Sequence, residues 1–382
     1  MQEVNVAHLT SVHPRFDPRI FLKECRSLSG AGYRVSLIVA DGKGDEEEDG
    51  IRILDVGRAA GRLQRLTVTL RRIRRRALEL DADIYHLHDP ELLSIAGALR
   101  RAGKQVIFDA HEDVPVQILG KSYLHPWVRK FLSNAYELYA ARVCRRLSAV
   151  VTATPFIRER FLPISPNSID VNNFPLPDEL ASSDVGQTVE RRHVCYVGGI
   201  NVIRGIREIV SAMDMVESGA RLILGGSFQE EGLRGELKAC AGWDSVDERG
   251  WLGRDAIRDV LSESAAGLVT LHPQPNYLDA HPVKMFEYMS AGVPVISSNF
   301  PLWRSIVEGN DCGLCVDPKQ PKEIAEAIDY LVRNPSRARE MGENGRKAVK
   351  AKYNWPAEER KLVELYDRLS DTTDEIQNVQ NA

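Results

Sequence analysis

Two opposite charges lie one helical turn apart in the stretch His281–Ile296, which reads HPVKMFEYMSAGVPVI. Lys284 and Glu287 are three residues apart, so both side chains can project from the same side of a helix. The amine and the helix N-terminal N–H groups favour a diphosphate, and the carboxylate can accept hydrogen bonds from ribose hydroxyls. The pattern indicates a nucleotide-sugar site, although an ion pair on a solvated helix has the same spacing.

The residues after this pair predict where its helix ends and which element comes next. Ala291-Gly292 is typical of a helix C-terminus, because glycine readily adopts the left-handed conformation needed there. Val293–Ile296 then has the pattern of a short buried strand. The charged pair therefore lies on a helix in front of a buried strand, as in an α/β domain.

The segment resembles the signature of retaining glycosyltransferase family 4. In that family a Glu, seven residues and a second Glu precede an Ala/Ser-x-Gly-x-Pro-Val sequence. Glu287 occupies the second acidic position, which the family uses for the nucleotide ribose. Asp279 stands where the family has its first Glu, near the donor sugar, and is one methylene shorter. The resemblance covers nearly the whole chain and implies a hexosyltransferase that retains anomeric configuration and needs no metal or other cofactor.

Length and composition set the broad class. A chain of 382 residues predicts two domains, and its formal net charge of −4 argues against nucleic acid as a partner. Because no apolar run of about 18 residues is present, we expect no transmembrane helix. The start MQEVNVAHLTSV shows no secretory signal pattern, so we expect a cytoplasmic protein. Cys312 and Cys315 have no second cysteine pair nearby and are interpreted as packing residues in a reducing compartment.

Strands that alternate with helices predict parallel sheets with crossover helices. A polar run, Pro163–Glu190, is the expected linker, and the alternation restarts at His193. In the first half we expect strands at Val4–Ser11, Val35–Val39, Ile84–His88, Val106–Ala110 and Ala149–Thr154, and helices at Arg19–Ala31, Leu63–Leu80 and Pro126–Leu147. In the second half we expect strands at His193–Val197, Leu222–Leu224 and Gly267–Leu271, and helices at Ile206–Met213, Gly232–Ala241 and Ala357–Leu369.

The resemblance implies the α/β architecture called GT-B, in which two Rossmann-like doubly wound parallel-sheet domains face one cleft. An N-terminal domain, residues 1–175, would bind the acceptor. A C-terminal domain, residues 191–352, would bind the nucleotide sugar. Residues 353–370 would form a helix that crosses back to the first domain, and the polar residues after Ser370 are expected to fray.

A glycine turn follows the first strand of the second domain. Gly198 and Gly199 let backbone N–H groups approach a phosphate, or they permit tight packing only. Gly199 stands where the family usually has an Arg, and Arg204 stands at the position of its Lys, so one cation is missing. By resemblance, Trp251 and Leu252 lie in the loop that holds the base through the main chain.

Histidines end two strands of the first domain. His111 matches a family histidine that faces the donor hexose, and as the residue after a strand it can point into a cleft. His86 and His88 would lie on one strand face, and Asp89 could complete a metal site with them. Because family 4 enzymes need no metal, we expect Asp89 to lie near the acceptor instead.

Basic residues gather in the first domain. The loop with Arg15, Asp17 and Arg19 suggests an anionic acceptor, or a simple exposed basic loop. A cationic helix with five arginines between Arg71 and Arg76, and a basic, aromatic helix that starts near Trp127, can lie on an anionic lipid surface, or they are solvated helix faces. A peripheral position at the inner face of the cell membrane is therefore one expectation.

These patterns together predict transfer of a hexose from a nucleotide diphosphate sugar to the hydroxyl of a sugar or lipid-linked acceptor, in cell-surface polysaccharide or glycolipid biosynthesis. A GT-B epimerase or phosphorylase, or a degenerate transferase that only binds, remains an alternative. The expected catalytic residues are Asp279, His111, Arg204 and Lys284. The expected donor-binding residues are Gly198, Gly199, Arg204, Trp251, Leu252, Lys284 and Glu287, and those on the acceptor side are Arg15, Asp17, Arg19 and Asp89, with no metal ligand.

Overall fold

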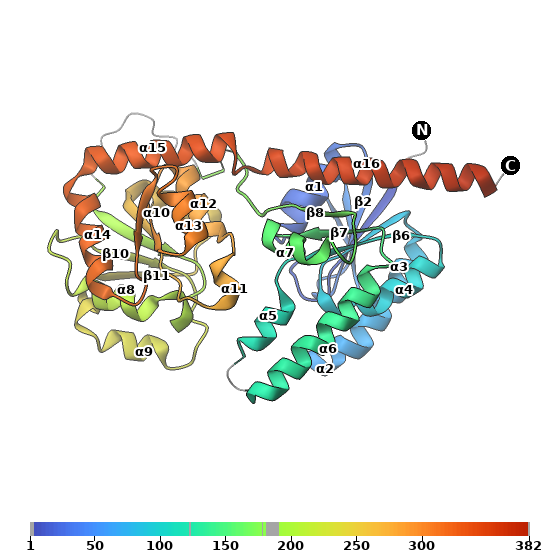
Figure 1. Cartoon of the computed structure of the whole chain (residues 1–382), viewed down its shortest axis with the longest axis horizontal. Coiled ribbons are helices and arrows are strands. Elements are labelled where there is room, and N and C mark those ends of the chain that lie inside the picture. Colours follow the sequence, from blue (N-terminus) through green and yellow to red (C-terminus); the bar gives the residue numbers. More distant parts are fainter. Residues whose placement is uncertain (1–3, 122–123, 178, 181–190, 381–382) are drawn as a thin grey trace. The chain divides into compact units, whose positions relative to one another are not determined.

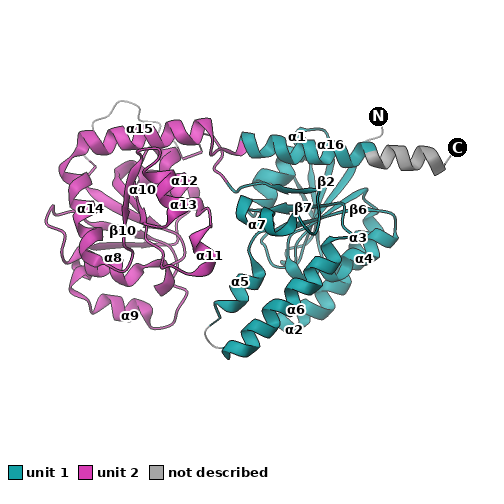
Figure 2. Ribbon diagram, viewed as in Figure 1, with its two compact units in different colours: residues 1–173, 356–382 teal, residues 174–355 magenta. Residues whose placement is uncertain are grey.

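The chain forms two compact units in the computed structural model, which describes residues 4–121, 124–177, 179–180 and 191–380, with side chains up to residue 371. Unit 1 comprises residues 1–173 and 356–382, and unit 2 comprises residues 174–355 (Figure 2). Each unit has its own sheet and its own apolar core.

The sheet of unit 1 has the order β3-β4-β2-β1-β5-β6-β7-β8 (Figure 1). All neighbours pair in parallel except the edge strand β3, which runs antiparallel to β4. The order reverses between β1 and β5, and this switch point is where doubly wound sheets place ligands. The strands are β1 Asn5–Leu9, β2 Arg34–Val39, β3 Glu46–Glu48, β4 Ile51–Asp55, β5 Ile84–Leu87, β6 Gln105–Ala110, β7 Ala149–Thr152 and β8 Ser168–Asp170.

The helices of unit 1 cover its sheet with amphipathic faces. In α3, for example, Leu70, Ile73 and Ala77 are buried at helical spacing while the arginines between them remain outside. The helical segments are the π-helical η1 Ile20–Cys25, α1 Arg26–Gly30, α2 Arg62–Gln64, the π-helical η2 Arg65–Thr69, α3 Leu70–Leu80, η3 Pro90–Leu92, α4 Leu93–Arg101, α5 Val114–Leu119, α6 Pro126–Cys144, α7 Pro155–Phe161 and α16 Trp355–Gln380.

The sheet of unit 2 is parallel throughout, in the order β11-β10-β9-β12-β13-β14. Its switch point lies between β9 and β12, so a ligand is expected at the carboxyl ends of these two strands. The strands are β9 His193–Val197, β10 Leu222–Gly225, β11 Val246–Gly250, β12 Ser264–Val269, β13 Val295–Ser298 and β14 Gly313–Val316. The helices are η4 Val202–Arg204, α8 Ile206–Met213, α9 Leu233–Lys238, η5 Ala241–Ser245, α10 Arg254–Glu263, α11 Pro275–Leu278, α12 Val283–Ala291, α13 Pro301–Val307, α14 Pro321–Arg333 and α15 Pro335–Ala351.

The structure confirms most of the predicted elements and corrects others. Helix α12 ends as expected, with Gly292 at a left-handed φ of 69°. The predicted linker is wrong in part, because Ser168–Asp170 within it pairs with β7 as strand β8. Residues 181–190 of that linker lie outside the described residues. The predicted helix end at Leu369 is also wrong, since α16 continues to Gln380.

Two further expectations concern cysteines and membrane spans. Burial raises the pKa of the Cys312 thiol to about 12 and that of Cys315 to about 11, which suits packing rather than redox chemistry. Among the helices that the structure describes, none is both long and apolar enough to cross a bilayer.

Candidate functional site

A glycine turn at the carboxyl end of β9 lies against two cationic side chains. Gly198 has a left-handed φ of 130°, and a Cβ placed there would lie 3.3 Å from Lys284 Nζ. A Cβ at Gly199 would lie 2.8 Å from the Arg204 guanidinium, which donates to the Gly199 carbonyl at 3.2 Å. The turn therefore brings together Gly198, Gly199, Arg204 and Lys284 at the switch point of unit 2, as the sequence predicted.

The Lys284 amine has no hydrogen-bond partner among the described residues, although its Nζ is inaccessible to solvent. It lies 3.5 Å from the ring centroid of Tyr196, a cation–π distance. Burial, and then repulsion by Arg204, lower the pKa of Lys284 well below its ordinary value. A buried amine without an acceptor is costly, so an anion at this position would complete its bonding.

Helix α12 fixes Lys284 through the buried residues on its other side. Met285, Phe286 and Met289 are fully buried in the core of unit 2. The Tyr288 hydroxyl accepts a hydrogen bond of 3.0 Å from the N–H of Val197, the last residue of β9. The helix is therefore tied directly to the strand that leads into the glycine turn.

Glu287 is held by an arginine that the sequence pattern did not reveal. Arg254, at the start of α10, bonds Glu287 Oε1 at 2.7 Å and Glu179 Oε1 at 2.7 Å. Arg254 directly follows Trp251-Leu252-Gly253, the loop predicted to hold the base. Its position at the start of a helix next to that loop was the only sequence signal that could have indicated a role at the site. The ribose contact of Glu287 stays a prediction, in which Arg254 would orient the carboxylate.

The other predicted donor residues lie in two loops of unit 2. Asp279 follows α11 and makes no hydrogen bond or ion pair with the described residues, and its loop is held by a 2.8 Å bond from the Trp303 indole to the Ala280 carbonyl. Trp251 is 78% exposed, whereas Leu252 packs against the core. Their contacts with sugar and base stay predictions.

In unit 1, His111 lies beside a buried ion pair. Its Nε2 is 2.9 Å from Asp109 Oδ2, and the Arg19 guanidinium bonds the same carboxylate at 3.0 and 3.1 Å. Burial alone would raise the pKa of Asp109, but Arg19 and His111 outweigh it and hold that pKa well below its usual range. His111 is partly exposed, so it can still meet a ligand.

Asp89 binds the loop after β1 and makes no hydrogen bond or ion pair with His86 or His88 among the described residues. It accepts hydrogen bonds from Thr10 Oγ1 at 2.8 Å and from the Ser11 N–H at 2.6 Å, and it pairs with His13 at 3.1 Å. These bonds fix Asp89 at the switch point between β1 and β5. The idea that Asp89 would complete a metal site with His86 and His88 is therefore not supported by the geometry.

The arginines of the loop after β1 are buried, which corrects the expectation of a free cationic loop. Arg15 is 3% exposed and pairs with Asp41 and Glu46 at 2.7 and 2.6 Å. Arg19 is bound by Asp109, and the Asp17 carboxylate accepts from the Arg19 N–H at 2.9 Å. Both positive charges are neutralised within the unit, because buried guanidinium groups require carboxylate partners.

Comparison with known proteins identifies the family. Residues 179–348 match the model of glycosyl transferases group 1, and residues 19–171 match that of Glycosyltransferase Family 4. This chain belongs to glycosyltransferase family 4. The chain is 22% identical over 329 residues to phosphatidyl-myo-inositol mannosyltransferase of Mycobacterium leprae, covering 84% of this chain and 82% of the relative. It is 22% identical over 271 residues to D-rhamnosyltransferase WbpZ of Pseudomonas aeruginosa, covering 70% and 69%.

Solved structures support the GT-B fold of this family 4 glycosyltransferase. Sucrose-phosphate synthase from Thermosynechococcus elongatus has a TM-score of 0.77 at 19% identity, covering 97% of this chain and 100% of that one. HepE from Anabaena, in complex with UDP and glucose, has a TM-score of 0.72 at 13% identity, covering 96% and 100%. The predicted fold class and family are confirmed.

Proposed function

We propose that this glycosyltransferase moves a hexose from a nucleotide diphosphate sugar to an acceptor hydroxyl with retention of configuration and without a metal at the diphosphate. The observation that carries the proposal is the buried, unpartnered amine of Lys284 beside Arg204 and the Gly198-Gly199 turn. Two cationic groups at a switch point match the charge of a diphosphate, and the Gly199 N–H, which has no partner among the described residues, can donate to it.

The proposed mechanism uses the donor's own diphosphate as the base. The bond between the anomeric carbon and the diphosphate oxygen breaks, and the acceptor oxygen forms its new bond on the same face. The leaving diphosphate takes the acceptor proton. Arg204, Lys284 and backbone N–H groups stabilise the growing negative charge where it develops. Glu287 would hold the ribose.

Asp279 and His111 are proposed to hydrogen-bond hydroxyls of the transferred sugar. The Asp279 carboxylate is free to accept such bonds, because it has no partner among the described residues. His111 keeps exposed surface while Asp109 orients its ring at 2.9 Å. Trp251 and Leu252 are proposed to border the base.

The test is transfer or slow donor hydrolysis by the purified protein with UDP, GDP and ADP sugars. GDP-mannose is the first choice, because a relative that is 26% identical over 248 residues is named a GDP-mannose-dependent mannosyltransferase. The one-bond C1–H1 coupling at the anomeric carbon of the product, measured by NMR, reports retention. An inverted product would refute the mechanism, and donor binding without turnover for every sugar would favour a binding protein.

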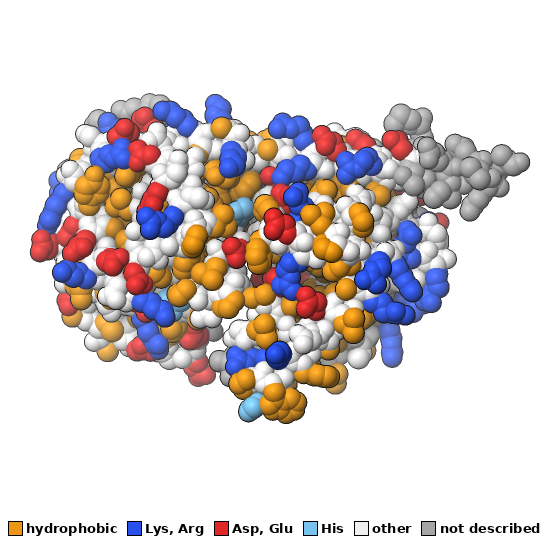
Figure 3. Space-filling model, in the orientation of Figure 1, with side chains coloured by type: hydrophobic (Ala, Val, Ile, Leu, Met, Phe, Trp, Pro, Cys, Tyr) orange, Lys and Arg blue, Asp and Glu red, His pale blue; other side chains and the backbone are white. Residues whose placement is uncertain are grey.

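A lipid-linked acceptor is proposed from the surface of unit 1, with a role in cell-surface polysaccharide or glycolipid biosynthesis at the inner membrane face. Basic side chains gather around α3 and α4 (Figure 3). Near the start of α6, Trp127 and Phe131 are 68% and 66% exposed. Exposed aromatic rings and basic helix faces in the same unit suit an anionic membrane surface.

A further inference from the structure

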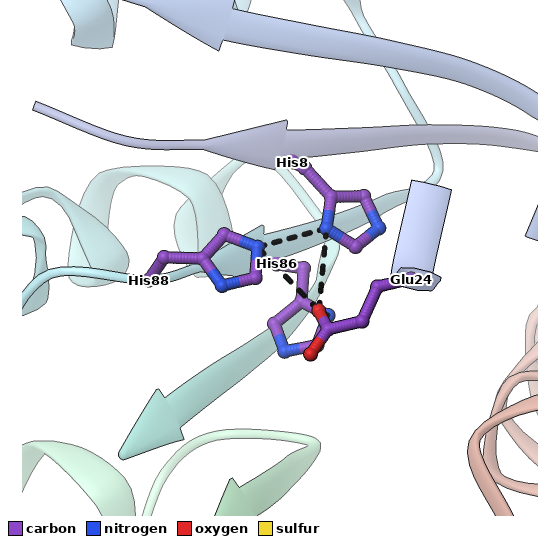
Figure 4. A group of neighbouring side chains, drawn as sticks. All are labelled: His8, Glu24, His86 and His88. Carbon is purple, nitrogen blue, oxygen red and sulfur yellow. Dashed lines mark hydrogen bonds and ion pairs between the residues drawn. The ribbon is translucent and has the colours of Figure 1, made fainter. Parts of the chain in front are cut away.

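Three histidine rings meet at the switch point of unit 1. His8 on β1 and His86 on β5 are direct partners in neighbouring parallel strands, so their side chains lie on the same face of the sheet. His88 follows two residues after His86 and joins that face (Figure 4). Each ring is at most 1% exposed, and the centroids of His86 and His88 are 4.6 Å apart.

A glutamate from the π-helical segment η1 completes this group. Glu24 Oε2 lies 3.8 Å from His8 Nδ1, 3.8 Å from His88 Nε2 and 4.0 Å from His86 Nδ1 (Figure 4). The side chain is fully buried. Its Oε1 forms an ion pair with Arg19 Nε at 3.0 Å, whereas Oε2 has no hydrogen-bond partner among the described residues. The same guanidinium binds Asp109, so one cation serves two buried carboxylates, and a further cation between Oε2 and the imidazoles would balance the second charge.

We propose that His8, Glu24, His86 and His88 bind one divalent transition-metal ion, with Zn²⁺ as the natural occupant. Three imidazole nitrogens and one carboxylate oxygen form a donor set suited to tetrahedral zinc. Bonds of about 2.0–2.1 Å in a tetrahedron separate the ligand atoms by about 3.3 Å. The separations found, 2.8 Å between His8 Nδ1 and His88 Nε2 and 3.8–4.0 Å to Glu24, lie on both sides of this value.

The surroundings match those of metal-bound histidines, whose second ring nitrogen usually meets a carboxylate or another polar group. His88 Nδ1 lies 3.5 Å from Asp109 Oδ2 and 3.1 Å from His111 Nε2. The Tyr366 hydroxyl lies 3.4 Å from His8 Nε2. The same hydroxyl lies 2.9 Å from His86 Nδ1. If Nδ1 binds the ion, His86 must therefore lose its hydrogen bond with Tyr366.

The ion would have a structural and positioning role, because no substrate reaches fully buried ligands. It would join β1, β5 and η1 at one point, and it would fix the ring of His88 that contacts His111. The proposal is independent of the diphosphate chemistry, whose residues belong to unit 2. Its test therefore measures metal content and stability, and transfer is not needed as a readout.

The first experiment measures metal in the full chain produced without a histidine tag in zinc-supplemented medium. We expect about one zinc per chain by plasma mass spectrometry after dialysis. Protein produced in cobalt-supplemented medium should show the strong visible absorption of tetrahedral Co²⁺. Less than a tenth of an equivalent in both preparations, with no change of melting temperature on adding Zn²⁺, would overturn the proposal.

Two substitutions with matched controls locate the ion. Glu24→Gln and His8→Gln should each weaken metal binding by at least about a hundredfold, since even outer partners of metal ligands contribute about 10–100-fold. Glu79→Gln and His125→Gln, which change exposed residues of the same unit, should bind one equivalent like the wild type. Full zinc content in both cluster variants would show that the ion lies elsewhere and refute the site.

A variant that fails to fold would still leave a test in the wild-type protein. A strong chelator applied under mildly denaturing conditions should remove the ion and lower the melting temperature, and Zn²⁺ should restore it. A glutamate that is simply protonated in a hydrogen-bonded network predicts the opposite behaviour. In that case Glu24→Gln, which copies the neutral acid, would melt like the wild type, and the chelator would have no effect.

Discussion

Replacing Lys284 by methionine should weaken donor binding and, at the same time, stabilise the free protein. Methionine fills a similar volume beside Tyr196 but carries no amine. In the free protein the change removes a buried group that has no hydrogen-bond partner among the described residues. In the donor complex it removes a cation from the proposed diphosphate site.

The two effects have different expected sizes. An unsatisfied buried polar group costs about 1–3 kcal/mol, so the melting temperature should rise by about 2–12 °C for a unit of this size. A hydrogen bond to a charged group contributes about 1.5–3 kcal/mol, so donor affinity should fall by about 10- to 150-fold. Residues of binding sites often lower the stability of the free protein, so replacing them can raise stability while it reduces function.

The pH dependence gives a second measure of the same prediction. The pKa of Lys284 is lowered in the free protein by burial and Arg204, and a bound diphosphate would raise it again by stabilising the ammonium. The complex would then hold more protons than the free protein, so donor affinity should increase as the pH falls between the two pKa values. The methionine variant should lack this contribution.

Calorimetric titration with the nucleotide sugar that the wild type binds, at several pH values, measures both affinity and proton uptake. Melting curves without donor measure stability. Lys322→Met, at a lysine that is exposed on α14, is the control and should change neither quantity. Wild-type affinity in the Lys284 variant, or an unchanged pH dependence, would refute the role of this amine.

Three further predictions concern the ribose, the metal and the membrane. Glu287→Gln keeps the shape but loses charge-assisted bonding to the ribose of about 1.5–3 kcal/mol, so donor affinity should fall about tenfold or more. The weakened ion pair with Arg254 should cost only about 0–1 kcal/mol of stability, and wild-type affinity by calorimetry would contradict the role of Glu287. Transfer rates should not require added Mg²⁺ or Mn²⁺ and should survive brief exposure to EDTA, whereas loss of activity reversed by either ion would contradict the metal-free diphosphate site. Replacing Arg71, Arg72, Arg74 and Arg75 by Gln should strongly reduce sedimentation with anionic vesicles at low salt, since each cation contributes about 1 kcal/mol to membrane binding. The same change should leave donor hydrolysis unaffected. Wild-type protein that stays in solution with both anionic and neutral vesicles would favour a soluble acceptor.

The regular part of the fold was predictable because its strands and helices are long enough to show a periodic pattern. The strand β9 and the helix α8 were predicted with the bounds that the structure shows. The short edge strands were not predictable. Glu46–Glu48 and Ser168–Asp170 have three residues each, and β3 is acidic and exposed, so pairing with a neighbour alone makes them strands.

The candidate site was predictable only where its residues are close in sequence. Lys284 and Glu287 share one helical turn, and the local spacing was enough to indicate their chemistry. Arg254 lies 33 positions before Glu287 and meets it through tertiary packing. His8 and Glu24 likewise join His86 and His88 through strand register and helix placement, which no local spacing specifies.

Comparison of the two switch points indicates how an acceptor can be held. In unit 2 the Lys284 amine is unpaired among the described residues, whereas in unit 1 the guanidinium of Arg19 and the carboxylate of Asp109 already bind each other. Breaking a buried ion pair by taking away one partner costs about 3–5 kcal/mol, which is comparable to the whole binding energy of a weak substrate. We therefore predict that an acceptor at this switch point leaves the pair intact and contacts the partly exposed His111 ring. Arg19 and Asp109 then position His111 and do not themselves bind the acceptor.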